Sequence, residues 1–134
     1  MSSPRVLIVE DELLIALDVE QALIAAGYEI CGVASSEAEA LILADETHPD
    51  LAVVDINLNP GDGRNVARAL SEKHNTVVLF ATSQCTELDR RMGAIACLPK
   101  PYLADDVPAA LRAVEAMAHG RAPDALPDHM FALA

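Results

Sequence analysis

The chain has 134 residues, enough for one domain with a sizeable buried core. Its hydrophobic fraction of 52% excludes an intrinsically disordered chain. The net charge of −12, from 21 acidic and 9 basic side chains, disfavours direct binding to nucleic acid or to an anionic membrane and favours cations or basic protein surfaces.

Cysteine usage and the N-terminus indicate the compartment. The three cysteines, Cys31, Cys85 and Cys97, are odd in number and form no CxxC pair, so no disulfide is predicted. Cys97 is expected to be a packed core thiol and Cys85 an inert residue at an exposed helix start. The first residues lack a signal-peptide pattern, and no apolar run reaches the roughly 18 residues of a membrane-spanning helix. These observations predict a reducing, cytoplasmic setting.

Short apolar runs alternate with longer helical patterns along the chain. The apolar runs predict strands at residues 6–9, 29–34, 51–54, 76–81 and 94–98. The longer patterns predict helices at residues 12–26, 36–46, 64–73, 84–92 and 103–119, of which the fourth is short or mobile. Alternation of this kind predicts an α/β fold with a flavodoxin-like, doubly wound, five-stranded parallel sheet of order 2-1-3-4-5 and five helices. Residues 1–119 form this domain, and residues 120–134 are expected to be a partly disordered tail.

Polar residues follow the predicted strands at the points where the strands end. Glu10 and Asp11 follow the first strand, Asp55 the third, Thr82 the fourth and Lys100 the fifth. The carboxyl ends of parallel strands meet at one edge of the sheet, and ligands bind there in such folds. We therefore expect these side chains to lie together, although they span ninety residues of sequence.

The acidic residues of this group suit a magnesium ion. Mg²⁺ prefers octahedral oxygen ligands and keeps several waters. Asp11 and Asp55 can supply carboxylate oxygens, Glu10 can act through water, and Asn57 can offer its backbone carbonyl. Carboxylates this close repel one another unless a cation lies among them. On its own, the acidic pair could equally serve as favourable charges at a helix N-terminus.

The remaining residues suit phosphoryl transfer to a carboxylate. Asp55 can attack a phosphorus atom, as carboxylates do in aspartyl-phosphate chemistry. Lys100 can pair with the phosphoryl oxygens, and Thr82 can donate a hydrogen bond to them. Positioning and charge neutralisation are most of what this reaction requires.

Residues 5–118 resemble the receiver domain of two-component response regulators. The resemblance rests on Val6-Leu-Ile-Val-Glu-Asp-Glu12, Leu51-Ala-Val-Val-Asp-Ile-Asn57, Asp62-Gly63, Phe80-Ala-Thr82 and Pro99-Lys-Pro101. It implies phosphorylation of Asp55 with Mg²⁺ by a histidine kinase or histidine phosphotransfer protein. It also implies a cis peptide between Lys100 and Pro101, and a phosphoacceptor that assists its own phosphorylation and dephosphorylation rather than a turnover enzyme.

The chain departs from the usual receiver pattern at the readout. Cys97 stands three residues before the lysine, where typical receivers have a Tyr or Phe whose rotation couples to the threonine hydroxyl. The segment from Thr82 to Lys100 is also short by roughly one helical turn. These features resemble atypical single-domain regulators of α-proteobacteria and predict an output through contact with a downstream protein. We expect residues 82–92 to order when a phosphoryl group binds Thr82.

The first predicted helix carries apolar residues on two faces. Ile15, Val19 and Leu23 lie on the face assigned to the core. Leu13 and Leu17 lie on the other, where they predict an exposed docking patch for a helix of the phosphoryl donor.

Two further functions are compatible with parts of the pattern. A phosphohydrolase could use Asp55 as its nucleophile, but such enzymes need a second Asp two residues later, where this chain has Asn57. A receiver cut from a DNA-binding regulator is the other alternative, although residues 120–134 do not look like a recognition helix.

Overall fold

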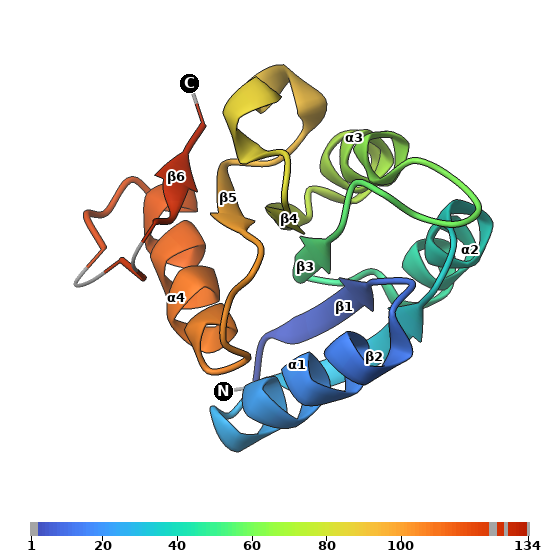
Figure 1. The fold of residues 1–134 in the computed structure, drawn as a ribbon, viewed down its shortest axis with the longest axis horizontal. Helices are drawn as coiled ribbons and strands as arrows, with labels where there is room; N and C mark the ends of the chain where they lie inside the picture. Colours follow the sequence, from blue (N-terminus) through green and yellow to red (C-terminus); the bar gives the residue numbers. More distant parts are fainter. Residues whose placement is uncertain (1–2, 124–125, 128, 134) are drawn as a thin grey trace.

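A computed structural model describes residues 3–123, 126–127 and 129–133, which form one sheet between two helical layers (Figure 1). The strand order is β2-β1-β3-β4-β5-β6, with β1 to β5 parallel and β6 antiparallel to β5. The strands are β1 (Arg5–Val9), β2 (Glu29–Ala34), β3 (Leu51–Val54), β4 (Val77–Thr82), β5 (Ala96–Pro99) and β6 (Phe131–Ala132). The α-helices of this part are α1 (Leu13–Ala25), α2 (Glu37–Thr47), α3 (Gly63–His74) and α4 (Asp106–Ala118).

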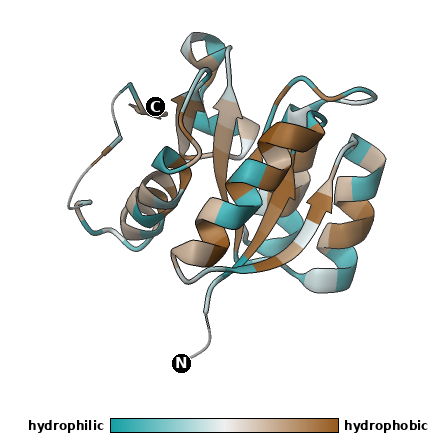
Figure 2. Cartoon of the chain, turned by 60° about the horizontal axis from the view of Figure 1, so that its bottom comes forward, coloured by the Kyte–Doolittle hydropathy of each residue, from teal (hydrophilic) through white to brown (hydrophobic). Residues whose placement is uncertain are grey.

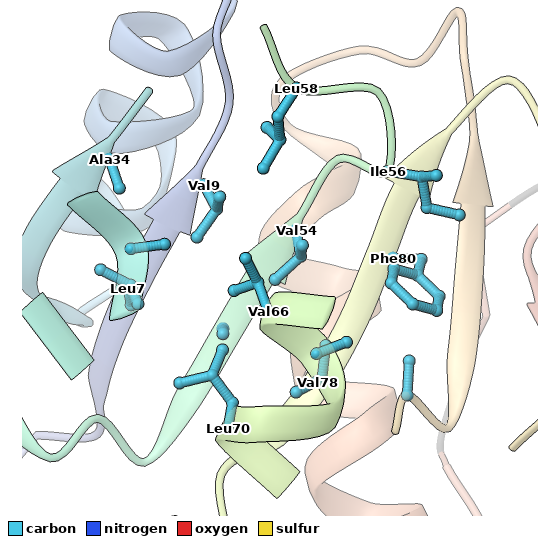
Figure 3. Close-up of a cluster of buried hydrophobic side chains, with 14 of the residues drawn as sticks. Leu7, Val9, Ala34, Val54, Ile56, Leu58, Val66, Leu70, Val78 and Phe80 are labelled. Atoms are coloured by element: carbon cyan, nitrogen blue, oxygen red, sulfur yellow. The ribbon is translucent and has the colours of Figure 1, made fainter. Parts of the chain in front are cut away.

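The predicted doubly wound α/β fold and its order 2-1-3-4-5 are confirmed. Successive strand residues point to opposite faces of the sheet, so each face carries its own hydrophobic layer. In β1, Leu7 and Val9 face α2 and α3, whereas Val6 and Ile8 face α1 and α4. Figure 3 shows the first layer, in which side chains of α3 pack on β1, β3 and β4. This two-sided burial explains why the strands are almost wholly apolar.

The fourth predicted helix is the main local difference. Two single turns of 3₁₀-helix, η1 (Cys85–Glu87) and η2 (Arg90–Met92), occupy residues 84–92, so the described residues form four α-helices rather than five. The prediction of a short element was right in length. Gly93 ends η2 in the left-handed region.

The prediction that the cysteines form no disulfide is wrong. Cys85 and Cys97 are bridged, with their Cα atoms 5.6 Å apart, and Cys31 is free. Cys85 is buried rather than exposed, and Cys97 is not a thiol in this state. The sequence spacing gave no sign of this pair, because η1 folds back over β5 and brings the residues together. The reducing compartment inferred from cysteine usage therefore loses that support.

The C-terminal residues add a strand that the sequence did not predict. Ala132 pairs with Ala96, and the Leu133 amide donates a hydrogen bond to the Ile95 carbonyl over 2.9 Å. Leu133 is buried in the layer on the α3 side. Figure 1 shows β6 beside β5, at the edge of the sheet. The predicted partial disorder of the tail stays a prediction, and residues 124, 125, 128 and 134 lie outside the described part.

Helices that could cross a bilayer, by length and hydropathy together, do not occur among the described residues.

Candidate functional site

The fold gathers the predicted polar residues at the carboxyl edge of the sheet. Lys100 follows β5, and its Nζ donates hydrogen bonds to Glu10 Oε1 over 2.8 Å and to Asp55 Oδ2 over 3.0 Å. Glu10 and Asp55 are both buried. The prediction that the strand ends meet is therefore confirmed for residues that are 90 positions apart along the chain. Glu12 also reaches Lys100, at 3.9 Å, a contact that the sequence reading missed.

Three carboxylates form an acidic cluster at this edge. Ligand oxygens of Glu10, Asp11 and Asp55 all lie within 4.8 Å of one another. A single lysine faces this group, so negative charge is left uncompensated where the side chains converge. Hard oxygen donors with surplus negative charge are the set that a magnesium ion prefers. The residues present fit that ion, with Glu10, Asp11 and Asp55 as its candidate ligands.

The surroundings raise the pKa of two of these groups, which favours the neutral form of Glu10 and the charged form of Lys100. Burial, reinforced by the charge of Asp55, raises the pKa of Glu10 to about 7 in the metal-free protein, despite the hydrogen bond from Lys100. For Lys100, burial alone would lower the pKa, but hydrogen bonds with Glu10 and Asp55 outweigh it and raise the pKa. Lys100 therefore stays charged at neutral pH, whereas Glu10 is poised to exchange its proton for a cation.

Thr82 lies at the end of β4, fully buried. Its Oγ1 has no hydrogen-bond partner among the described residues. A buried hydroxyl without a partner costs about 1–3 kcal/mol, so such groups are rare in folded proteins and a functional role is one reason for them. The Lys100 amide donates to the Thr82 carbonyl over 3.0 Å, so the backbones of the two residues are neighbours.

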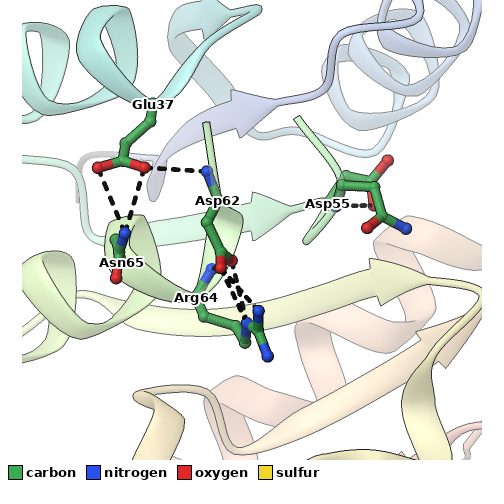
Figure 4. Close-up of polar contacts among 6 residues, drawn as sticks. Glu37, Asp55, Asp62, Arg64 and Asn65 are labelled. Atoms are coloured by element: carbon green, nitrogen blue, oxygen red, sulfur yellow. Dashed lines mark hydrogen bonds and ion pairs between the residues drawn. The ribbon is translucent and has the colours of Figure 1, made fainter. Parts of the chain in front are cut away.

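The loop that follows Asp55 is held by a residue that the sequence reading did not single out. Glu37 Oε1, at the start of α2, accepts a hydrogen bond from the Asp62 amide over 2.9 Å and one from Asn65 Nδ2 over 3.3 Å (Figure 4). The Asn57 amide donates to Asp55 Oδ1 over 3.2 Å. Because Glu37 precedes the loop by some twenty residues, no local pattern pointed to it.

Close packing fixes the other end of that loop. A Cβ atom at Gly63 would overlap the carbonyl of Asp55, so only glycine lets α3 begin directly against the end of β3. The Asp62 side chain caps α3 by accepting from the Arg64 amide over 2.9 Å. Asp55 is thereby held between a rigid strand and a rigid helix start.

The predicted readout position lies on the same face of the sheet as Thr82. Cys97 pairs with Phe80 and is packed with it in one layer, and Thr82 follows Phe80 by two residues. The disulfide joins Cys97 to Cys85, whose sulfur lies 3.6 Å from the Thr82 carbonyl oxygen. A disulfide therefore occupies the position at which typical receivers have a rotating aromatic ring. The predicted absence of that ring follows from the sequence, whereas the disulfide does not.

The outer face of α1 is apolar and exposed. Leu13 is 66% exposed, Leu14 77% and Leu17 43%, whereas Val19 and Leu23 are buried as predicted. Figure 2 shows hydrophobic colouring on α1, at the front of that view, as well as on the strands behind it. A groove of about 410 Å³ runs beside this helix and is lined by Ile15, Asp18, Val19, Ser83, Lys100, Pro101, Tyr102 and Ala104. The groove therefore connects the Ile15 side of α1 with Lys100, and Leu13, Leu14 and Leu17 do not line it.

Residues 6–112 match the response regulator receiver domain. The chain belongs to the response regulator receiver family. It is 42% identical over 110 residues to the transcriptional regulatory protein PdtaR of Mycobacterium tuberculosis. This match covers 78% of this chain and 54% of that protein. It is 36% identical over 119 residues to PrrA of Mycobacterium leprae, covering 85% of this chain and 51% of that protein. This receiver thus spans about half the length of the curated relatives it matches.

Solved receiver structures share the architecture. The receiver domain of PhyR from Erythrobacter litoralis superposes with a TM-score of 0.77 at 25% identity, covering 86% of this chain and 92% of that one. The receiver domain of a modulated diguanylate cyclase from Desulfovibrio desulfuricans gives a TM-score of 0.68 at 35% identity, covering 78% of this chain and 86% of that one.

The predicted cis peptide at Lys100-Pro101 is confirmed, and a second one joins Asn59 to Pro60.

Proposed function

We propose that this receiver accepts a phosphoryl group on Asp55 from a histidine kinase or a histidine phosphotransfer protein. The observation that carries the proposal is the convergence of the Asp55 carboxylate, the Lys100 ammonium and the unpartnered Thr82 hydroxyl at one edge of the sheet. Burying such polar groups at one place costs free energy, which supports a functional role for them.

Each side chain has a distinct part in the transfer. An Asp55 carboxylate oxygen bonds to phosphorus as the bond from phosphorus to the donor histidine nitrogen breaks, and the histidine keeps that electron pair. Lys100 moves from Asp55 to a phosphoryl oxygen and balances its charge. Thr82 donates its free hydroxyl to another phosphoryl oxygen, which satisfies a group that now lacks a partner.

Glu10, Asp11 and Asp55 would hold Mg²⁺, with the Asn57 carbonyl as a further predicted ligand. The ion, when bound, neutralises the phosphoryl oxygens and the acidic cluster. Glu10 would give up its proton on binding, because its raised pKa reflects the cost of burying a second negative charge. Glu37 would keep the Asn57 loop in place by its bonds to Asp62 and Asn65.

The donor would dock on the outer face of α1. Leu13 and Leu17 supply an exposed apolar patch, and the groove that Ile15 and Tyr102 line leads to Lys100. A helix laid on this patch would bring its histidine to the acidic cluster, as helix-in-groove recognition requires. Because such donors draw their phosphoryl groups from ATP, we also propose that the receiver works in the cytoplasm.

The signal would leave through contacts with a downstream protein, without an aromatic switch and without nucleic-acid contact by this domain. The absence of an aromatic side chain at Cys97 and the net charge of −12 support these two parts of the proposal. The stand-alone role predicted from the sequence belongs to the same proposal. The mass of the endogenous protein, measured by intact-protein mass spectrometry, tests it.

Phosphorylation with a small acyl phosphate and Mg²⁺ tests the central claim. The wild-type chain should gain one phosphoryl group at Asp55, and Asp55→Asn should gain none. Release of many phosphates per protein would instead indicate a phosphohydrolase and would sink the proposal.

A further inference from the structure

We propose that Cys85 and Cys97 are a reversible thiol oxidation site that controls the phosphoryl response of residues 83–92. The coupling to phosphorylation rests on the proposed function, whereas the redox site itself does not. In the bridged state the disulfide ties η1 to the middle of β5. Cys31 on β2, the remaining cysteine, is free.

The bridge lies where a phosphoryl signal would leave the site. Cys85 follows Thr82 by three residues, and its Sγ is 3.6 Å from the Thr82 carbonyl oxygen. On the other side, Cys97 lies on β5 and pairs with Phe80 of β4, two residues before Thr82. Any movement of the chain after Thr82 toward a bound phosphoryl group therefore pulls on the Cys85 end of the bridge.

The bridged segment has no α-helix or strand of its own. Its other anchors are the packing of Leu88 and Met92 on the layer beside α3 and a hydrogen bond that Arg90 Nε donates to the Leu133 carbonyl over 3.0 Å. Residues 84–92 form two single turns of 3₁₀-helix. Hydrogen bonds of 3.0–3.4 Å, donated by the amides of Glu87, Leu88, Met92 and Gly93, close these turns. Such turns are weak, because their hydrogen-bond geometry is poor. Opening a bridge that closes a separation of 12 residues restores conformational freedom to all of them. Oxidation would thus hold the segment closed, and reduction would release it.

The setting of the proposed function favours a reversible bridge. In a reducing compartment disulfides are rare, and those that occur are usually transient and redox-sensing. The co-reactant is a thiol or dithiol of low molecular weight or a protein dithiol. Its thiolate attacks the Sγ of Cys85, because that residue is 5% exposed against 0% for Cys97. Cys97 then leaves as the thiolate and takes up a proton.

A second thiol completes the reaction. It attacks the co-reactant sulfur of the mixed disulfide, so Cys85 is released as a thiolate and is protonated. Two electrons and two protons have then passed from two thiols to the protein, and the co-reactant is left as a disulfide. Oxidation of the protein by a small disulfide is the reverse of these two steps.

Differential alkylation and amide exchange of the whole chain test the redox site without any phosphoryl donor. Under native conditions, dithiothreitol should make Cys85 and Cys97 reactive to an alkylating reagent, and oxidised glutathione should restore the bridge. Amide exchange of residues 84–92 should rise about tenfold or more on reduction, because local opening becomes easier, while α3 stays unchanged. Cys31→Ser is the matched control and should behave as wild type.

Three results would overturn the redox site. They are two free thiols in the air-oxidised protein, a bridge that resists dithiothreitol in the folded state, and exchange that is unchanged or that rises throughout the chain on reduction. Because the wild-type protein carries this test, a variant that fails to fold does not affect it.

Phosphorylation with acetyl phosphate and Mg²⁺ then tests the coupling. Phosphoryl-dependent protection of residues 84–92 should occur in the reduced wild type and in Cys85→Ser, and should be lost in the oxidised wild type. An equal response in both redox states would overturn the coupling. Failure of Asp55 to take up phosphate in either state would instead overturn the proposed function and leave the exchange result on the redox site standing.

Discussion

The acidic cluster and the bridged segment lie on the same edge of the sheet but are built in different ways. Glu10, Asp55 and Lys100 each follow a strand directly, so the sheet fixes where they meet. Residues 83–95 have no strand or α-helix. A disulfide, turn hydrogen bonds, the packing of Leu88 and Met92, and the bond from Arg90 to the Leu133 carbonyl hold them. The proposed phosphoryl chemistry thus rests on the rigid part of the molecule. The proposed readout rests on a part whose stability one covalent bond would change.

Removing the nucleophile gives the largest expected effect and tests the proposed role of the acidic cluster, the rigid one of the two regions. Asp55→Asn keeps the size of the side chain and removes the carboxylate, so phosphorylation should fall to background. Intact-protein mass spectrometry after treatment with acetyl phosphate measures it. Residual modification at another carboxylate at the wild-type rate would show that Asp55 is not the acceptor.

A change on the exposed face of α1 should slow transfer from a phosphohistidine protein but not phosphorylation by a small phosphodonor. Leu17→Asp places a charge on the exposed apolar face of α1, so transfer from a phosphohistidine protein should slow by about tenfold or more, as loss of an interface anchor does. Phosphorylation by acetyl phosphate should be unchanged, because the acidic cluster is intact. The rates are compared by radiolabel transfer.

Ile42→Asp is the control for this prediction. Ile42 lies on α2 and is 58% exposed, so its replacement by Asp is a comparable change on a different helix. It should leave both donors unaffected. If Leu17→Asp slowed both donors equally, the patch would not be a docking surface.

Much of this site could be predicted from the sequence, and the reason is geometric. Parallel strands end at a common edge, so a strand pattern is enough to bring Asp55 and Lys100 together. The same periodicity identified the exposed Leu13 and Leu17, because helical spacing separates two faces without reference to the rest of the fold.

The features that were missed depend on contacts between elements. Glu37 acts on a loop that is distant in sequence, and β6 forms only because β5 is left as an edge. The disulfide depends on how the chain folds between Cys85 and Cys97, where no periodic pattern exists. Local pattern therefore predicted the position of the acidic cluster better than the structure of the bridged segment.

The raised pKa of Glu10 predicts a pH dependence of stability in the rigid half. The metal-free folded protein keeps a proton on Glu10 that the unfolded chain releases above about pH 4.5. The folded state therefore binds more protons between pH 4.5 and about 7, and the free energy of unfolding should fall across that window as pH rises, by on the order of 2 kcal/mol. Lys100 stays charged throughout and adds no slope.

Urea unfolding in EDTA at pH 5, 6 and 7 measures this slope. Glu10→Gln should flatten it, because the amide does not titrate. Mg²⁺ requires the carboxylate form, so its stabilisation should grow over the same range. A slope that Glu10→Gln leaves unchanged would assign the titration to another group.

The smallest expected effect lies where the two regions meet, at Thr82. Thr82→Val keeps the shape of the side chain and removes a buried hydroxyl that has no partner, so the metal-free protein should become more stable by about 1 kcal/mol. The same variant should still take up phosphate at Asp55 but should lose phosphoryl-dependent protection of residues 84–92 in the reduced state. Urea unfolding and amide exchange measure the two results. A destabilised variant that kept the response would mean that Thr82 serves packing and that the signal reaches the bridged segment by another route.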